Sequence, residues 1–402
     1  MKIGYIHPNP FPAVIANIVQ IVQMCRAFAV MGHEVTLFVP RGREFTDDES
    51  ALAKARELFG DPLQFQLVFV KRRTIMGRMQ VLGSVWGTLK ALRDHPVDLL
   101  YTRNPWSVPF LKKTGIPFVF ESHDAHLHES SKLLGSLLRK WIVHTSHHPR
   151  MVKLVAISRA LVKVWSELGV SPAKLISAHD AVELEMFKAS MTKEDARRIV
   201  NIKDGDPIVL YTGSLKADRG MDLILDAALR LTGMRFIIIG GTRQEADALR
   251  GKAARLGAHN VLVKGSIPHK EIPHWLAAAD ILLMMWTWQV STIKVCSPMK
   301  LFEYMAAKRH VVGPAFPTVL EVLEDEIDAI LFEPDKLEAM ISALRQAHVK
   351  LDDPAMPEAA FKKVAADYTW NARCRRILDS LPPLASLKNN SKLNSGQNSA
   401  GH

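Results

Sequence analysis

The sequence predicts an α/β protein made of two doubly wound, Rossmann-like domains, each with a parallel sheet between layers of helices. Its 402 residues are 48% hydrophobic and 23% charged, which is typical of globular proteins, excludes a wholly disordered, collagen-like or coiled-coil chain, and suits two or three domains. Short apolar strand patterns alternate with amphipathic helix patterns in both halves of the chain. That alternation indicates parallel sheets with right-handed crossovers.

Strands are predicted wherever short apolar runs are bounded by turn residues. In the first half these runs are Lys2–His7, Glu34–Pro40, Gln64–Val70, Asp98–Tyr101, Pro117–Glu121, Lys153–Ile157 and Lys174–Ser177. A helix from about Ala13 to Met31 joins the first two, because its apolar side chains recur at three- and four-residue steps until Gly32. In the second half the runs are Ile208–Gly213, Arg235–Gly240, Asn260–Gly265, Ile281–Met285, His310–Val312 and Ala329–Leu331.

A polar, turn-rich stretch from Val182 to Pro207 separates the two halves. We therefore expect a first domain over residues 1–190 and a second over 191–365. The tail over 384–402 has almost nothing to bury and is expected to be disordered. The carboxyl ends of both strand sets should border one cleft, which is where ligands bind in such folds.

The net charge of +11, from 52 Lys and Arg against 41 Asp and Glu, is concentrated in two windows. The window 62–93 holds six cations and the window 130–166 holds seven, and neither contains an acid. If helical, these segments resemble those that lie on an anionic membrane surface, and the alternative is a core-facing helix with a solvated basic face. Nucleic acid is not expected as a partner, because no nucleic-acid-binding motif accompanies the charge.

Three widely spaced cysteines, Cys25, Cys296 and Cys374, suit neither a disulfide framework nor a Cys-x-x-Cys metal site. No uninterrupted apolar run is long enough to span a membrane, and the start of the chain lacks the apolar stretch of a signal peptide. We expect a cytoplasmic protein, either free or bound peripherally to the inner face of the plasma membrane.

A first candidate site follows the predicted strand that ends at Thr212. Gly213 and Ser214 open a short cationic loop that reaches Arg219, and a helix begins at about Met221. Free backbone N–H groups, the positive end of a helix dipole and the two-donor grip of an arginine together suit a phosphate. The alternative is a surface loop that binds no phosphate.

A second candidate site begins at Ser297. Pro298 suits a first helical turn, so Ser297 is the expected N-cap and the N–H groups of Met299 and Lys300 should point into the cleft. Glu303 lies one turn deeper among apolar neighbours, so a buried carboxylate there would need a partner such as a ribose hydroxyl pair. An ordinary solvated glutamate is the alternative.

A third candidate site, at the end of another apolar strand, holds Glu121, His123, Asp124, His126 and His128. Their spacing matches no common zinc arrangement, so no metal is expected. We favour one functional histidine, His123, because it is closest to the strand end. Structural or solvated histidines are the alternative.

The order of these motifs resembles glycosyltransferase family 4, whose fold is GT-B. The specific signal is the block from Ser297 to Ala306, and the supporting signals are Gly32–Leu37, Glu121–His123, Val155–Ser158, and Tyr211–Ser214 followed by Arg219 and Gly220. The resemblance extends from residue 1 to about 381. It implies that the segment 366–383, which includes Tyr368-Thr369-Trp370, forms a helix that crosses back to the first domain.

The resemblance implies a metal-independent, hexosyltransferase-type enzyme that moves a sugar, with retention, from a UDP- or GDP-sugar to an acceptor. His123 matches the histidine that contacts the transferred sugar, Arg219 the residue that holds the diphosphate, and Glu303 the glutamate that binds the ribose. Further donor contacts are expected at Gly213, Ser214, Ser297, Pro298, Met299, Gly265 and Ile267. In the first domain, which holds the acceptor in this fold, they are expected at Asn9, Phe11 and Asn17.

Three departures mark a divergent member. Val295 stands at the first glutamate of the Glu-x7-Glu motif, Ser214 at the first diphosphate arginine, and Asn9–Pro12 at the usual Gly-Gly. Lys300, one turn before Glu303, is expected to restore the cation that is missing at Ser214. Met284–Trp288 forms either the end of a core strand or a stacking platform.

The basic windows lie in the first domain and favour a lipid-linked or cell-surface glycan precursor as acceptor, and thus a role in cell-envelope polysaccharide biosynthesis. One alternative is a non-catalytic protein that binds a nucleotide-sugar or a partner. Another is a sugar-nucleotide epimerase, for which no acid and base motif is present. The sequence carries no indication of oligomeric state.

Overall fold

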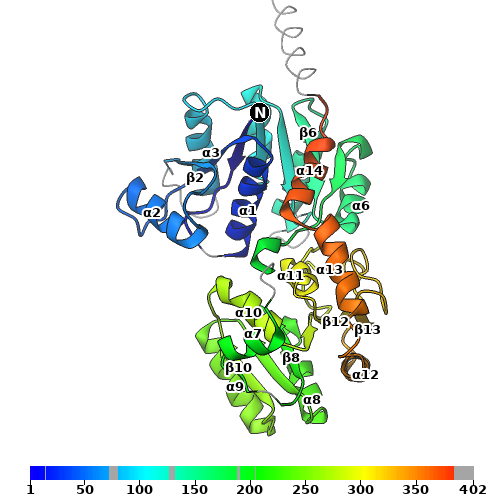
Figure 1. Ribbon diagram of the computed structural model, residues 1–402. Helices are drawn as coiled ribbons and strands as arrows, with labels where there is room; N and C mark the ends of the chain where they lie inside the picture. The colour runs from blue at the N-terminus through cyan, green and yellow to red at the C-terminus, as the bar shows by residue number, and fades with distance from the viewer. Residues whose placement is uncertain (14, 72–79, 126–131, 188–190, 204, 384–402) are drawn as a thin grey trace, which may run out of the picture. The chain divides into compact units, whose positions relative to one another are not determined.

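The structure is a computed structural model that describes residues 1–383 except 14, 72–79, 126–131, 188–190 and 204 (Figure 1). It comprises two compact units, the first formed by Met1–His179 with the chain from Trp370 onward, and the second by Asp180–Thr369. The domain limits drawn from the sequence, 1–190, 191–365 and 366–383, stay a prediction. The tail over 384–402, expected to be disordered, lies outside the described residues.

The first unit is built on a seven-stranded, all-parallel sheet with the strand order β3-β2-β1-β4-β5-β6-β7. Its strands are β1 Lys2–Ile6, β2 Glu34–Val39, β3 Gln66–Phe69, β4 Leu99–Thr102, β5 Phe118–Ser122, β6 Met151–Ala156 and β7 Leu175–Ser177. Each was predicted from the sequence, since a buried parallel strand reads as a continuous apolar run. In the register, Ile3 of the central strand β1 pairs with Val35 and Leu99.

Helices connect these strands. They are α1 Ala16–Val30, α2 Asp48–Phe59, α3 Gln80–Ala91, α4 Val108–Leu111, α5 Lys132–Ser146, α6 Arg159–Glu167 and α14 Trp370–Asp379, with short 3-10 turns at Lys112–Thr114 and Pro172–Lys174. Helix α14 comes from the end of the chain and packs against α1. The contact is apolar and buried, with Cys25 and Phe28 on α1 and Cys374 and Ile377 on α14.

The second unit is built on a six-stranded, all-parallel sheet with the order β10-β9-β8-β11-β12-β13. The strands, all predicted, are β8 Ile208–Thr212, β9 Arg235–Ile239, β10 Val261–Gly265, β11 Ile281–Leu283, β12 His310–Pro314 and β13 Ile330–Phe332. The helices are α7 Lys193–Ile199, α8 Met221–Arg230, α9 Arg243–Leu256, α10 Ile272–Ala278, α11 Met299–Ala306, α12 Leu337–Val349 and α13 Ala355–Asp367, with 3-10 turns at Leu184–Phe187, Ala217–Arg219 and His269–Glu271. Alternate strand residues point to opposite faces, so Val209 and Leu210 belong to two separate hydrophobic clusters.

A buried ion pair secures the amino ends of the second sheet's strands. Asp280, just before β11, accepts hydrogen bonds from Arg197 Nη2 at 2.7 Å and Lys193 Nζ at 2.8 Å. The same carboxylate accepts the backbone N–H of Ile208 at 2.7 Å. This pair therefore joins α7 to β8 and β11, at the end of the sheet opposite to the carboxyl ends.

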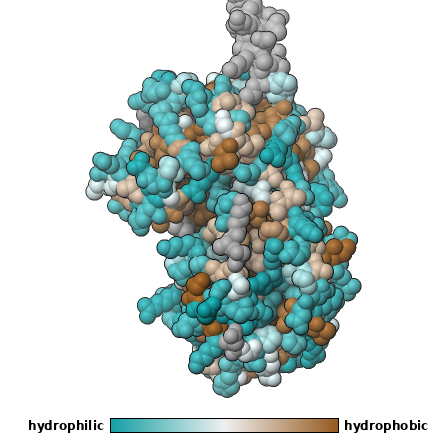
Figure 2. Space-filling view, in the orientation of Figure 1, coloured by the Kyte–Doolittle hydropathy of each residue, from teal (hydrophilic) through white to brown (hydrophobic). Residues whose placement is uncertain are grey.

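Hydrophilic side chains cover most of the visible face, with hydrophobic ones in scattered groups (Figure 2). Among the described residues, no helix combines the length and the apolar character that crossing a bilayer requires.

Candidate functional site

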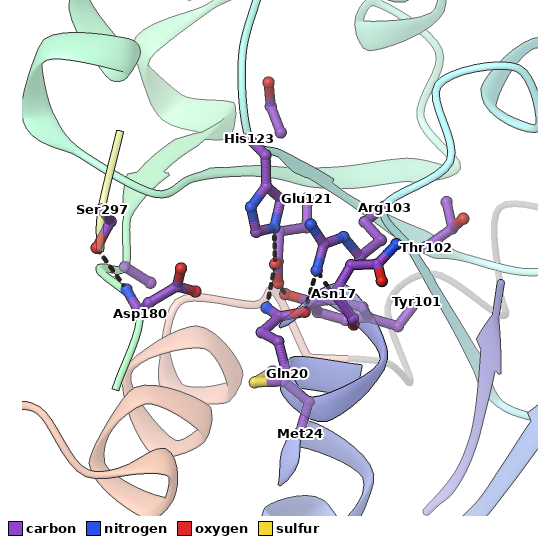
Figure 3. A network of polar contacts seen from close by, with 12 residues as sticks. Asn17, Gln20, Met24, Tyr101, Thr102, Arg103, Glu121, His123, Asp180 and Ser297 are labelled. Atoms are coloured by element: carbon purple, nitrogen blue, oxygen red, sulfur yellow. Dashed lines mark hydrogen bonds and ion pairs between the residues drawn. The ribbon is translucent and has the colours of Figure 1, made fainter. Parts of the chain in front are cut away.

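A buried carboxylate marks the carboxyl end of β5 in the first unit (Figure 3). The side chain of Glu121 is fully buried, and its Oε1 accepts Gln20 Nε2 at 2.6 Å and lies 2.6 Å from His123 Nε2. Its Oε2 accepts the hydroxyl of Tyr101 and, at 3.1 Å, Nη1 of Arg373. Side chains from three other elements and one loop thus converge on one carboxylate.

The charge of Glu121 fixes the proton on His123. Desolvation alone raises the pKa of this carboxyl, but the Arg373 guanidinium, the hydrogen bond from His123 and the charge of Arg103 hold it well below its usual range. An ionised carboxylate only accepts hydrogen bonds, so His123 donates from Nε2. Its side chain is 25% exposed, and within the described residues its hydrogen bond is made by Nε2, which leaves Nδ1 for a ligand.

A second polar group lies beside this network at the ends of β1 and β4. Arg103 Nη1 donates to Gln20 Oε1 at 2.5 Å, so the Gln20 amide links Arg103 to Glu121. His7 is buried, and burial together with the nearby Arg103 lowers its pKa to about 3. Its ring is therefore neutral at physiological pH, and neither ring nitrogen has a hydrogen-bond partner among the described residues.

The residues predicted for the acceptor side lie in and just after the loop that follows β1. Asn9 is partly buried, and Asn17 has a buried Oδ1 with no hydrogen-bond partner in the described part of the chain. Phe11 is completely buried and stacks on Phe59 with ring centroids 5.6 Å apart. Its side chain packs in the core, and the acceptor role of all three positions stays a prediction.

In the second unit two cations lie against the same aromatic ring. Lys300 Nζ is 4.3 Å from the ring centroid of Tyr211 and 5.5 Å from that of Trp286, and it donates to the carbonyl of Thr212 at 3.3 Å. The guanidinium carbon of Arg219 is 5.7 Å from the Trp286 ring. Both predicted diphosphate cations are thus brought together at the carboxyl end of β8.

These cations are incompletely neutralised. Burial and the charge of Arg219 lower the pKa of Lys300 to about 7, although Glu303 and Cys296 act in the opposite direction. Arg219 is 3.7 Å from Asp218, through Nε, while its Nη1 is buried without a hydrogen-bond partner among the described residues. An anion bound here would stabilise both charges.

The backbone beside Lys300 requires glycine. Gly213 has a φ of +142°, and a Cβ there would lie 3.1 Å from the Tyr211 hydroxyl and 3.3 Å from Lys300 Nζ. The ammonium therefore sits beside the Gly213–Ser214 turn, and the hydroxyl of Ser214 accepts the N–H of Lys216 at 3.4 Å. This is where the sequence predicted a replacement cation, and the replacement itself stays a prediction.

The start of α11 differs from the prediction. The helix begins at Met299 with Pro298 as its N-cap residue, so the expectation of a Ser297 cap was wrong. The reason is a competing donor, because Ser297 Oγ accepts the backbone N–H of Asp180 at 2.9 Å. Proline has no side-chain acceptor, which leaves the first N–H groups of the helix, at Met299 and Lys300, without a capping side chain.

Glu303 has a protein partner that the sequence did not indicate. Its Oε1 lies 3.2 Å from Nε2 of His269, and this hydrogen bond raises the pKa of His269 against the opposite effect of burial. Gly265, in a left-handed conformation, and the partly buried Ile267 lie in the segment just before His269. Their proposed contact with the nucleotide base stays a prediction.

The core interpretation of Met284–Trp288 holds for its first two residues, and the stacking platform stays a prediction. Met284 and Met285 are completely buried in the two hydrophobic clusters, whereas Trp286 lies beside the cations. Val295, at the position of the missing motif glutamate, is buried.

In the described part of the chain no three His, Cys, Asp or Glu side chains are grouped as metal ligands, and His126 and His128 lie outside the described residues.

Two family models match the chain. Residues 19–185 match Glycosyltransferase Family 4, and residues 206–348 match Glycosyl transferases group 1. Among curated proteins, TuaH of Bacillus subtilis, a glycosyltransferase named for teichuronic acid biosynthesis, is 27% identical over 54% of this chain. The alpha-D-kanosaminyltransferase of Streptomyces kanamyceticus is 27% identical over 64% of it. The chain spans about half the length of the first relative, 53%, and 68% of the second.

Solved structures of low sequence identity share the fold. A glycosyltransferase from Rickettsia africae has a TM-score of 0.75 at 15% identity, covering 97% of this chain and 99% of that one. HepE of Anabaena, in complex with UDP and glucose, has a TM-score of 0.71 at 14% identity, covering 94% and 99%.

Proposed function

The chain belongs to glycosyltransferase family 4 and has the GT-B fold, and on that basis we propose that it transfers a sugar, with retention, from a UDP- or GDP-sugar to a lipid-linked or cell-surface glycan precursor. The observation that carries the proposal is the pair of incompletely neutralised cations, Lys300 and Arg219, around Trp286. The name of TuaH, which refers to teichuronic acid, supports a cell-envelope acceptor.

The proposed chemistry uses these cations where charge develops. The acceptor hydroxyl oxygen bonds to the anomeric carbon on the face from which the diphosphate departs, and the departing phosphate oxygen takes the hydroxyl proton. Negative charge builds on the diphosphate as its bond to the sugar breaks, and preorganised cations in a water-poor site stabilise it. His123 orients the sugar, and no step requires a bound metal.

A donor screen followed by a transfer assay tests this proposal. We expect UDP or GDP and their sugars, but not ADP, to raise the melting temperature, since a ligand at 100 times its Kd stabilises the fold by about 2.7 kcal/mol. Donor incubated with the enzyme and a lipid extract should then yield free nucleotide and a heavier lipid. Stabilisation without transfer would instead support a binding protein, and no stabilisation by any nucleotide would contradict the proposal.

Glu303 provides a sharper test of the donor site. A carboxylate that binds a ribose hydroxyl pair contributes about 1.5–3 kcal/mol per charged hydrogen bond, so Glu303→Ala should weaken UDP or GDP binding in isothermal titration. Retained affinity would contradict the ribose assignment. Exposed Glu338 on α12, paired with Arg230, provides the matched control as Glu338→Ala.

We also propose that α5 rests on an anionic bilayer surface. Leu133, Leu137 and Trp141 recur at four-residue steps, which places them on one face, and they are 81%, 40% and 39% exposed. Lys140, beside them, is exposed, as is Trp86 on α3. Apolar side chains bordered by cations are the pattern of an interfacial helix. Residues 72–79 and 130–131 of the basic windows lie outside the described residues.

Vesicle sedimentation tests the membrane proposal. The protein should pellet with vesicles that contain anionic phosphatidylserine and remain in solution with neutral phosphatidylcholine, because each cation near the surface contributes about 1 kcal/mol. Leu137→Ser/Trp141→Ser should reduce pelleting, whereas Val349→Ser, at an 85% exposed position of the second unit, should not. Equal pelleting with both lipids, or equal effects of the two variants, would contradict it.

A further inference from the structure

We propose that Arg373 and Glu121 are positioning residues for His123, so that the C-terminal helix α14 contributes to the sugar-facing site of the first unit. The inference rests on the proposed function, because it assigns these residues a part in the transfer reaction. Its physical basis is a chain of two hydrogen bonds, from Arg373 Nη1 to Glu121 Oε2 and from His123 Nε2 to Glu121 Oε1. Within the described residues, Nε2 is the ring nitrogen of His123 that makes a hydrogen bond.

Arg373 is held on several sides. Its guanidinium is buried and donates to Glu121 Oε2, to the carbonyls of Ala178 and His179 at 3.2 and 2.8 Å, and to Met24 Sδ at 2.9 Å. A planar guanidinium fixed by several acceptors has little rotational freedom. Glu121 Oε2 is therefore fixed by a group that cannot turn away.

Through its hydrogen bond, the fixed Glu121 carboxylate orients one side chain that a ligand can reach. Of the four side chains bonded to its carboxylate, Gln20, Tyr101 and Arg373 are at most 2% exposed. His123 is 25% exposed. Among the described residues, His123 is thus the one partner through which this carboxylate can act on a sugar.

The arrangement is better suited to orientation than to stability. A buried ion pair is weak evidence for stability, since apolar side chains of similar volume often stabilise a fold equally well. A carboxylate that accepts the Nε2 proton selects one tautomer of the imidazole and fixes its ring plane. Arg373 keeps this carboxylate ionised, so that the carboxylate holds the Nε2 proton and leaves Nδ1 for the sugar.

Nuclear magnetic resonance of the ligand-free protein tests the orientation directly. With ¹⁵N-labelled histidine, and with His123→Gln to assign the signal, the wild type should show the Nε2-protonated tautomer. The double variant Glu121→Gln/Arg373→Met removes both charges together, so neither remains buried and unpaired, and it should give a mixture of tautomers. A matched double variant of the other buried pair, Arg197→Met/Asp280→Asn, should leave the His123 signal unchanged.

The second readout is the rate of sugar transfer. It is measured with the donor that the screen of UDP- and GDP-sugars identifies. The Glu121→Gln/Arg373→Met enzyme should lose about a hundredfold in kcat, which is what a misplacement of about 1 Å costs, with little change in the KM for donor. Arg197→Met/Asp280→Asn should retain wild-type kcat. An unchanged tautomer, or equal kcat losses in both double variants, would overturn the inference. If the wild type consumes no donor, the proposed function fails, whereas the tautomer still decides the orientation.

Discussion

Charged side chains lie at the carboxyl ends of the strands in both units, fully buried in the first and partly buried in the second, and their surroundings act on them in opposite ways. In the first unit Glu121 has Arg373 within 3.1 Å and hydrogen bonds from three further side chains. In the second unit Lys300 and Arg219 lie against Trp286, and the nearby acid Glu303 is bonded to His269 instead.

The pKa values record this difference. The surroundings of Glu121 hold its pKa well below the usual range and favour its charged form, whereas the surroundings of Lys300 lower its pKa to about 7 and disfavour its charged form. A buried charge that the protein already neutralises can orient a neighbour. A partly buried charge that the protein leaves incompletely neutralised attracts a ligand of opposite sign.

The largest expected effect that tests this comparison is on stability. Arg373→Met leaves the Glu121 carboxylate buried without its cation and should lower the free energy of unfolding by about 3–5 kcal/mol. Lys300→Met removes a charge that burial disfavours and should be neutral or stabilising. Urea denaturation of both variants measures the difference. Arg197→Met provides a graded comparison that should cost less than Arg373→Met, because Asp280 keeps Lys193 Nζ at 2.8 Å. Equal losses in Arg373→Met and Lys300→Met would contradict the comparison.

The next largest expected effect is on the rate of sugar transfer. Arg219→Ala and Lys300→Met should each lower kcat for donor by about 10²–10³, the usual loss when one charge-stabilising donor is removed. Lys308 is a matched control, because its ammonium also lies over an aromatic ring, 4.2 Å from the centroid of Phe361, and pairs with Glu358. Lys308→Met should retain wild-type kcat, and a similar loss there would show that the effect is not specific to the cation pair.

The sequence predicted the sheets well because a buried parallel strand is visible locally. It did not predict the distant partners of Glu121, because Gln20, Tyr101 and Arg373 are far from it in the chain and each is an ordinary polar residue of its own element. One local signal was available, since an acid at the end of an otherwise apolar strand must be paired if it is buried. The Ser297 cap failed for the same reason, because the competing donor, the N–H of Asp180, lies 117 positions away.

The smallest expected effect, and the most specific to Lys300, concerns how stability and nucleotide affinity depend on pH. Its pKa is 10.5 unperturbed and about 7 in the fold, so between these values the unfolded chain binds more protons and stability rises with pH. In the proposed function the diphosphate of UDP or GDP binds the charged form, so affinity should fall above pH 7 by up to about tenfold per pH unit. Isothermal titration from pH 6 to 9 measures this trend, and Lys300→Met should abolish both dependences. An affinity that is flat over this range in the wild type would mean that Lys300 does not contact the diphosphate as a cation.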